Sequence, residues 1–153
     1  MTPPSGTQKR LTLRIFGTNR LNKPLFEGGN LMNILFVGLG GAIGAVLRYL
    51  ISLIPIKTSY PILTLLTNLL GAVFIGFVAG MLSYGKISKN QSLFLKTGVC
   101  GGFTTFSTFS LESVQLLEQG KILGACSYMS LSLILCILGV VLGSCLSSFA
   151  HRG

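Results

Sequence analysis

Residues 98–110 combine three kinds of group that can do chemistry inside an otherwise apolar chain. A glycine pair, Gly101 and Gly102, is followed by hydroxyl residues interleaved with phenylalanines. So many helix-weakening residues in a row predict a break between Gly101 and Thr105, where backbone carbonyls lose their intrahelical partners. Uncoupled carbonyl oxygens suit a hard cation such as Na⁺. The alternative is a small-residue packing face with each hydroxyl bonded back to the preceding turn.

Two phenylalanines follow the expected break. Phe106 and Phe109 are three residues apart, so on a helix they share a face. An aromatic ring has a positive edge and a negative face, and edge-on rings could therefore meet an anion without a fixed charge that would trap it. Ordinary core packing is the alternative for both rings.

Polar residues recur at helical spacing in the neighbouring apolar runs. Thr64 and Asn68 are four residues apart, as are Tyr128, Ser132 and Cys136, so each set occupies one helix face. An amide deep in a span either bonds across helices or faces a polar path. Both roles stay open for Asn68.

Two charged residues lie within apolar segments. A charge in such a segment is costly and is by default a functional candidate. We expect Arg48 to attract anions to a pore mouth or to pair with Glu112, unless it only extends to the membrane interface. Glu112 is a candidate to line a vestibule, although a carboxylate does not obviously help an anion path.

These residues lie in segments long enough to cross a bilayer. Only 10% of the chain is charged and its mean hydropathy is +0.73, whereas a soluble domain is about a quarter charged. Residues 58–85 and 122–150 contain no charged side chain, and each exceeds the roughly 20 residues a span needs. Residues 32–56 form a third candidate and 92–118 a fourth. We predict an all-α membrane protein of four transmembrane helices, the third broken at mid-membrane.

The first predicted helix has one face with almost no side-chain bulk. Its glycines and alanines are concentrated in residues 38–45. In lipid, close backbone approach through small residues drives much of helix association. We therefore expect this face to be buried against protein.

The flanking residues are basic. We expect residues 1–31 to be a disordered basic extension, 32–150 the transmembrane domain and 151–153 a tail. A net charge of +9 does not indicate nucleic acid here, because most basic residues fall in the extension and in loops, as membrane topology requires. The cysteines lie inside apolar runs without Cys-x-x-Cys spacing, which argues against a zinc or redox site; they are Cys100, Cys126, Cys136 and Cys145.

Three motifs in separate predicted helices resemble the CrcB/Fluc family of fluoride channels. They are residues 40–49, 64–71 and 101–112, and the resemblance covers residues 33–150. It implies an antiparallel, dual-topology homodimer in the plasma membrane, with two fluoride pores and a structural Na⁺ on the dimer axis. A heterodimer, in which a paralogue replaces the second copy of the chain, is the alternative to the homodimer.

The resemblance also implies roles for particular residues. The backbone carbonyls of Gly101 and Thr104, two from each subunit, would hold Na⁺. Cys136 occupies a position where a hydroxyl residue is usual, and a thiol is a weaker donor. Arg48 and Glu112 would be charged residues that either lie at the pore mouth or have a structural role. The fluoride pore would be lined by Asn68, Phe106, Phe109, Tyr128, Ser132, Thr64, Ser107 and Thr108.

The function implied is passive export of cytoplasmic fluoride. An enzyme is disfavoured because Asp is absent and the one histidine is His151, so no nucleophile, base and orienter can be assembled. A small multidrug exporter would need an acidic residue in its first helix, and residues 32–56 have none. A structural membrane subunit remains the third possibility.

Overall fold

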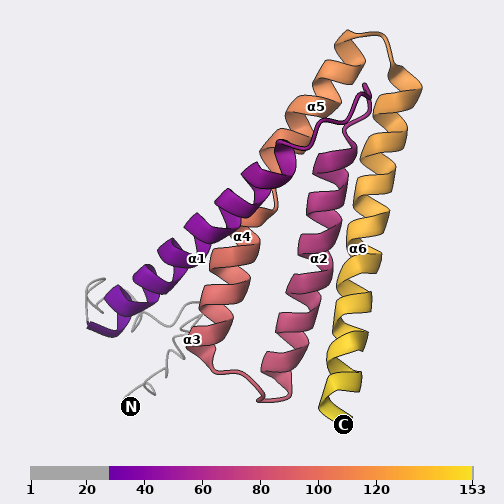
Figure 1. Cartoon of the computed structure of the whole chain (residues 1–153). Coiled ribbons are helices and arrows are strands. Elements are labelled where there is room, and N and C mark those ends of the chain that lie inside the picture. The colour runs from indigo at the N-terminus through magenta and orange to yellow at the C-terminus, as the bar shows by residue number, and fades with distance from the viewer. Residues whose placement is uncertain (1–27, 153) are drawn as a thin grey trace, which may run out of the picture.

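The computed structural model describes residues 28–152, and within this range every regular element is helical. Consecutive long segments run in alternate directions, so the start of α1 and the end of α6 lie at the same end of the molecule (Figure 1). The elements are α1 (Gly28–Ser52), α2 (Ile62–Ser83), α3 (Lys89–Ser92), η2 (Leu93–Cys100), α4 (Gly101–Phe103), α5 (Phe106–Glu118) and α6 (Ile122–Arg152).

Three helices in the described range are long and apolar enough to cross a membrane: α1, α2 and α6. The segment expected to cross third is divided into the successive pieces α3, η2, α4 and α5, which run beside the others (Figure 1). The all-helical prediction is confirmed, and so is the interruption of the third segment.

Glycines allow α2 and α6 to lie backbone against backbone. A Cβ placed on Gly76 would overlap the carbonyl of Val140, and one on Gly143 would overlap the carbonyl of Val73. Such contacts replace the hydrophobic effect as the source of helix association in lipid. The same contacts set α6 close enough to α2 to share a groove with it.

Glycines also join α1 to the third segment. A Cβ on Gly44 would overlap the Val99 carbonyl, and one on Gly102 would overlap the Gly41 carbonyl. Gly40 and Gly44 are both buried. The expectation that the small residues of the first helix pack against protein is confirmed for Gly40 and Gly44, whereas Gly38 and Ala42 are exposed.

The structure adds three details to the sequence-based expectation: the start of α1, the form of the helix before the break, and the position of the break within the predicted range. Helix α1 begins at Gly28 rather than near Asn33, so residues 28–31 of the expected extension are helical; residues 1–27 lie outside the described range. The π-helix η2, a wider helix often found at functional sites, was not predicted. The glycine pair is helical within α4, and the break follows it at Thr104 and Thr105.

Much of the apolar surface is left uncovered by a single chain. Only 11% of the apolar window of α1 and 17% of that of α6 are buried. Large side chains such as Leu39 and Leu133 are more than 60% exposed. Lipid, or a second protein, must cover these faces.

Candidate functional site

The break consists of two extended residues between short α4 and α5. Thr104 has φ −77° and ψ 155°, and Thr105 has φ −146° and ψ 113°, so neither can continue the helix. The Thr105 hydroxyl accepts the backbone N–H of Thr108 at 3.1 Å and so caps α5. The second half of the segment therefore begins as a new helix with its own N-terminus.

Asn68 of α2 holds the break in place. Its Oδ1 accepts the Thr105 N–H at 2.7 Å, and its Nδ2 donates to the Thr105 carbonyl at 3.1 Å. One turn further on, the missing side chain of Gly71 leaves room for the Thr104 methyl group. Of the two roles open for Asn68, the structure shows the bond across helices.

Two carbonyls at the break lose their helical donors to these bonds. In an unbroken helix the Gly101 carbonyl would accept from the Thr105 N–H, which instead bonds Asn68. The Thr104 carbonyl would accept from the Thr108 N–H, which instead bonds the Thr105 hydroxyl. A Cβ on Gly101 would meet no atom within 4 Å, so this part of the backbone borders open space.

The first pocket of the site is a groove of about 350 Å³ between α2, α5 and α6. It contains six residues that the sequence analysis singled out, which are Asn68, Thr104, Phe106, Phe109, Ser132 and Cys136. Among residues 28–152, no charged side chain lines it. Its full lining is Asn68, Gly71, Ala72, Ile75, Thr104, Thr105, Phe106, Phe109, Ser132, Leu133, Cys136 and Val140.

One polar atom in this groove is conspicuous. Ser132 is 6% exposed, and its Oγ is buried without a hydrogen-bond partner among the described residues. A buried hydroxyl without a partner carries a desolvation cost of about 1–3 kcal/mol. A ligand or water in the groove would remove that cost.

Three aromatic rings form a row, of which Phe106 and Phe109 line the groove and Tyr128 packs behind Phe109 without lining it. The ring centroids of Phe106 and Phe109 are 5.5 Å apart at 40°, and those of Phe109 and Tyr128 are 5.2 Å apart at 48°. Phe106 is 79% exposed, whereas Tyr128 is fully buried. The row thus runs from the surface of the single chain into its interior.

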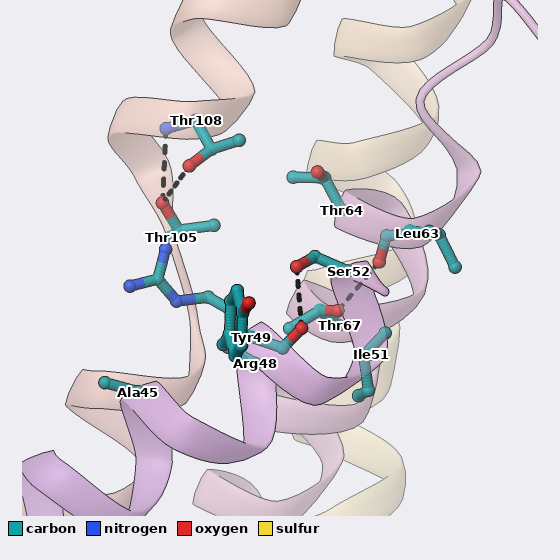
Figure 2. Close-up of a pocket in the computed structure, with 10 residues that line it drawn as sticks. All are labelled: Ala45, Arg48, Tyr49, Ile51, Ser52, Leu63, Thr64, Thr67, Thr105 and Thr108. Atoms are coloured by element: carbon teal, nitrogen blue, oxygen red, sulfur yellow. Dashed lines mark hydrogen bonds between the residues drawn. The ribbon is translucent and has the colours of Figure 1, made fainter. Parts of the chain in front are cut away.

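A second pocket, of about 310 Å³, lies where α1 ends against α2 and the break (Figure 2). It contains Arg48, Thr64 and Thr108, while Thr105 lines both this pocket and the groove. The Arg48 Nε donates to the Gly102 carbonyl at 3.3 Å. Arg48 therefore binds the backbone immediately before the break.

Glu112 accepts hydrogen bonds from two hydroxyl groups, one on α2 and one on α6. Its Oε1 accepts from the Thr64 hydroxyl at 2.8 Å and its Oε2 from the Tyr128 hydroxyl at 2.7 Å. The alternative of an Arg48–Glu112 pair is not seen, since Arg48 bonds the backbone instead. The carboxylate that sequence reasoning could not explain is the acceptor that satisfies a buried tyrosine.

Two residues at the break differ from the sequence-based expectation: Ser107 belongs to the predicted pore set, whereas Thr105 does not. Ser107 is exposed and lines neither pocket, and its Oγ lies 3.4 Å from that of Thr105. Thr105 was not singled out, although it contributes both the cap of α5 and the contact with Asn68. Its preference for the N-cap position, three residues before Thr108, was the available signal.

Comparison with known proteins agrees with this geometry. The family model for CrcB-like protein, Camphor Resistance (CrcB), matches residues 35–144. The chain is 45% identical over 121 residues to the fluoride-specific ion channel FluC of Ruminiclostridium cellulolyticum, a match covering 76% of this chain and 93% of that protein. It is also 45% identical over 117 residues to the protein of the same name from Methanococcus maripaludis, covering 76% and 96% of the two chains. The chain with the broken third segment and the aromatic groove belongs to the CrcB-like family.

Proposed function

We propose that this chain is a fluoride-selective channel of the plasma membrane, through which cytoplasmic fluoride leaves the cell passively. The observation that carries the proposal is the uncharged groove, where two phenylalanine rings and the unpartnered Ser132 hydroxyl meet. The relatives named as fluoride-specific ion channels support it. A channel catalyses no chemical reaction, so the function is not enzymatic.

The groove suits a small, strongly hydrated anion. Fluoride loses water on entering and needs donors in exchange, which the Ser132 hydroxyl and the edges of Phe106 and Phe109 supply. None of these groups carries a charge, so the anion can leave again. The Thr64 and Tyr128 hydroxyls donate to Glu112 and reach fluoride only if those bonds exchange.

The groove is completed by a second copy of the chain in an antiparallel dimer. A single chain leaves Phe106 79% exposed and Gly101 bordering open space, which suits an interface at the break. In this arrangement the broken segment forms the fourth membrane crossing. A paralogue of opposite orientation would serve equally well in place of the second copy.

The freed carbonyls fit a structural Na⁺ at that interface. Each chain offers the Gly101 and Thr104 oxygens, whose helical donors are bonded elsewhere. Two ligands from one chain are too few for a hard cation, and two chains supply four. When bound, the ion would satisfy carbonyls that lipid cannot hydrate.

Reconstitution in liposomes tests the function. We expect fluoride efflux without a proton gradient, and a much slower efflux of chloride from matched vesicles. Drug–proton exchange would instead support an exporter. The absence of both activities, in protein that remains folded, would support a structural subunit and contradict the channel.

The antiparallel arrangement has a separate test. A cysteine introduced at Lys57, in the loop before α2, is expected to react with a membrane-impermeant thiol reagent from both sides of sealed vesicles. Reaction from one side only would contradict the antiparallel homodimer and favour a paralogue as partner.

A further inference from the structure

The groove contains a thiol, and we propose that Cys136 is a binding site for soft monovalent metal ions of the Ag⁺ and Cu⁺ class. Occupation of this site would obstruct the groove and stop fluoride conduction. The obstruction rests on the proposed channel function, whereas the metal binding does not.

Two observations place the ligands together. Cys136 is partly exposed and lines the groove, one helical turn after Ser132 on α6. Ser132, in the same groove, has a buried Oγ without a partner among residues 28–152. The thiol residue and the residue with the unpartnered hydroxyl therefore line the same groove, which no side chain of the described protein fills.

The chemistry of the groove favours a soft cation over a hard one. Thiolate sulfur is the preferred ligand of Cu⁺ and of its heavier congener Ag⁺. Binding replaces the thiol proton: Cys136–SH and Ag⁺ give Cys136–S–Ag and H⁺. Among the described residues, no cationic side chain lines the groove to repel the metal.

The other cysteines differ from Cys136 in their surroundings and serve as controls. Cys126 and Cys145 are exposed on the outer surface of α6 and line no pocket described above. Cys100 is 1% exposed among packed helices. Only Cys136 combines a thiol with the groove.

The experiment follows fluoride efflux from chloride-free liposomes, in which silver stays dissolved, before and after adding micromolar Ag⁺. Each rate is divided by the same protein's rate without silver. We expect the wild-type rate to fall by about tenfold or more, because an ion that binds too tightly blocks the path it occupies. The efflux rate of Cys136→Ser is expected to change less than about twofold under the same silver treatment.

A matched pair separates groove binding from binding at other thiols. One variant keeps Cys136 and carries Cys126→Ser with Cys145→Ser; its partner keeps Cys145 and carries Cys126→Ser with Cys136→Ser. Cys100 stays in both because it is buried. We expect native mass spectrometry to detect one silver per chain in the first variant, and efflux inhibition in the first variant only.

Equal silver sensitivity of Cys136→Ser and the wild type would overturn the proposal, as would absence of bound silver in the variant that keeps Cys136. A protein that binds silver at Cys136 but conducts no fluoride would refute the channel function and leave the metal site standing. Silver bound at Cys136 without inhibition would refute the obstruction.

Discussion

Removal of the Asn68 side chain should release the break in the third segment. Asn68→Ala deletes both bonds to Thr105, the 2.7 Å bond from its N–H and the 3.1 Å bond to its carbonyl. Thr105 is 9% exposed, so its N–H is left without water or protein as acceptor. An unmet buried N–H costs about 1–3 kcal/mol, and the second bond adds about 0.5–1 kcal/mol. The free energy of unfolding should therefore fall by about 1.5–4 kcal/mol.

Equilibrium unfolding in mixed micelles measures this change, with fluoride efflux as a second readout. The matched control is Thr67→Val at the adjacent position, whose hydroxyl bonds only the Leu63 carbonyl of its own helix. We expect the control to lose less than about 1 kcal/mol and to keep its efflux. Equal stability loss in the two variants, with equal efflux, would refute the assignment of Asn68 as the residue that holds the break.

Three further perturbations test other contacts. Glu112→Ala should destabilise the fold by about 1–3 kcal/mol in the same unfolding assay, because the buried Tyr128 hydroxyl loses its acceptor. Adding Tyr128→Phe to that variant should recover part of the lost stability. The control Glu118→Ala, at an exposed position, should have no measurable effect. Gly143→Ala should cost about 1–3 kcal/mol through overlap with α2, whereas Gly124→Ala, which meets only an ordinary contact, should be neutral or stabilising. Replacing Na⁺ with a large organic cation should weaken the dimer in cross-linking, and an unchanged dimer would count against the carbonyl site.

Much of the fold could be predicted because membrane-spanning segments can be recognised from local amino-acid composition. A span needs a long run without charge, and such runs delimit α2 and α6 to within a few residues. The glycines of α1 predicted a close helix–helix contact, because small residues in membrane helices commonly allow two backbones to approach each other. The family resemblance rested on the same local patterns and was confirmed by comparison with known proteins.

The break lies within the predicted range of residues 101–105, at the C-terminal end of that range and not at the glycine pair itself. The glycine pair suggested the break because glycine weakens a helix, yet both glycines are helical within α4, and a Cβ on Gly102 would overlap the Gly41 carbonyl of α1. The chain leaves the helix at Thr104 and Thr105, where Asn68 supplies substitutes for the lost backbone bonds. Local propensity was overridden by a partner distant in sequence.

The sequence by itself determined the membrane-spanning class, the helix order, the family and the small set of polar residues in apolar surroundings. The tertiary structure alone decided how those residues pair: Asn68 bonds Thr105, and Glu112 accepts from Thr64 and Tyr128. It also leaves the Ser132 hydroxyl without a partner within the described part of the chain. Spacing along one helix defines a face, but the partner of a polar group is set by which helix packs against that face, and at what register. In this chain the register depends on backbone contacts at glycines, and each of these contacts joins two different segments.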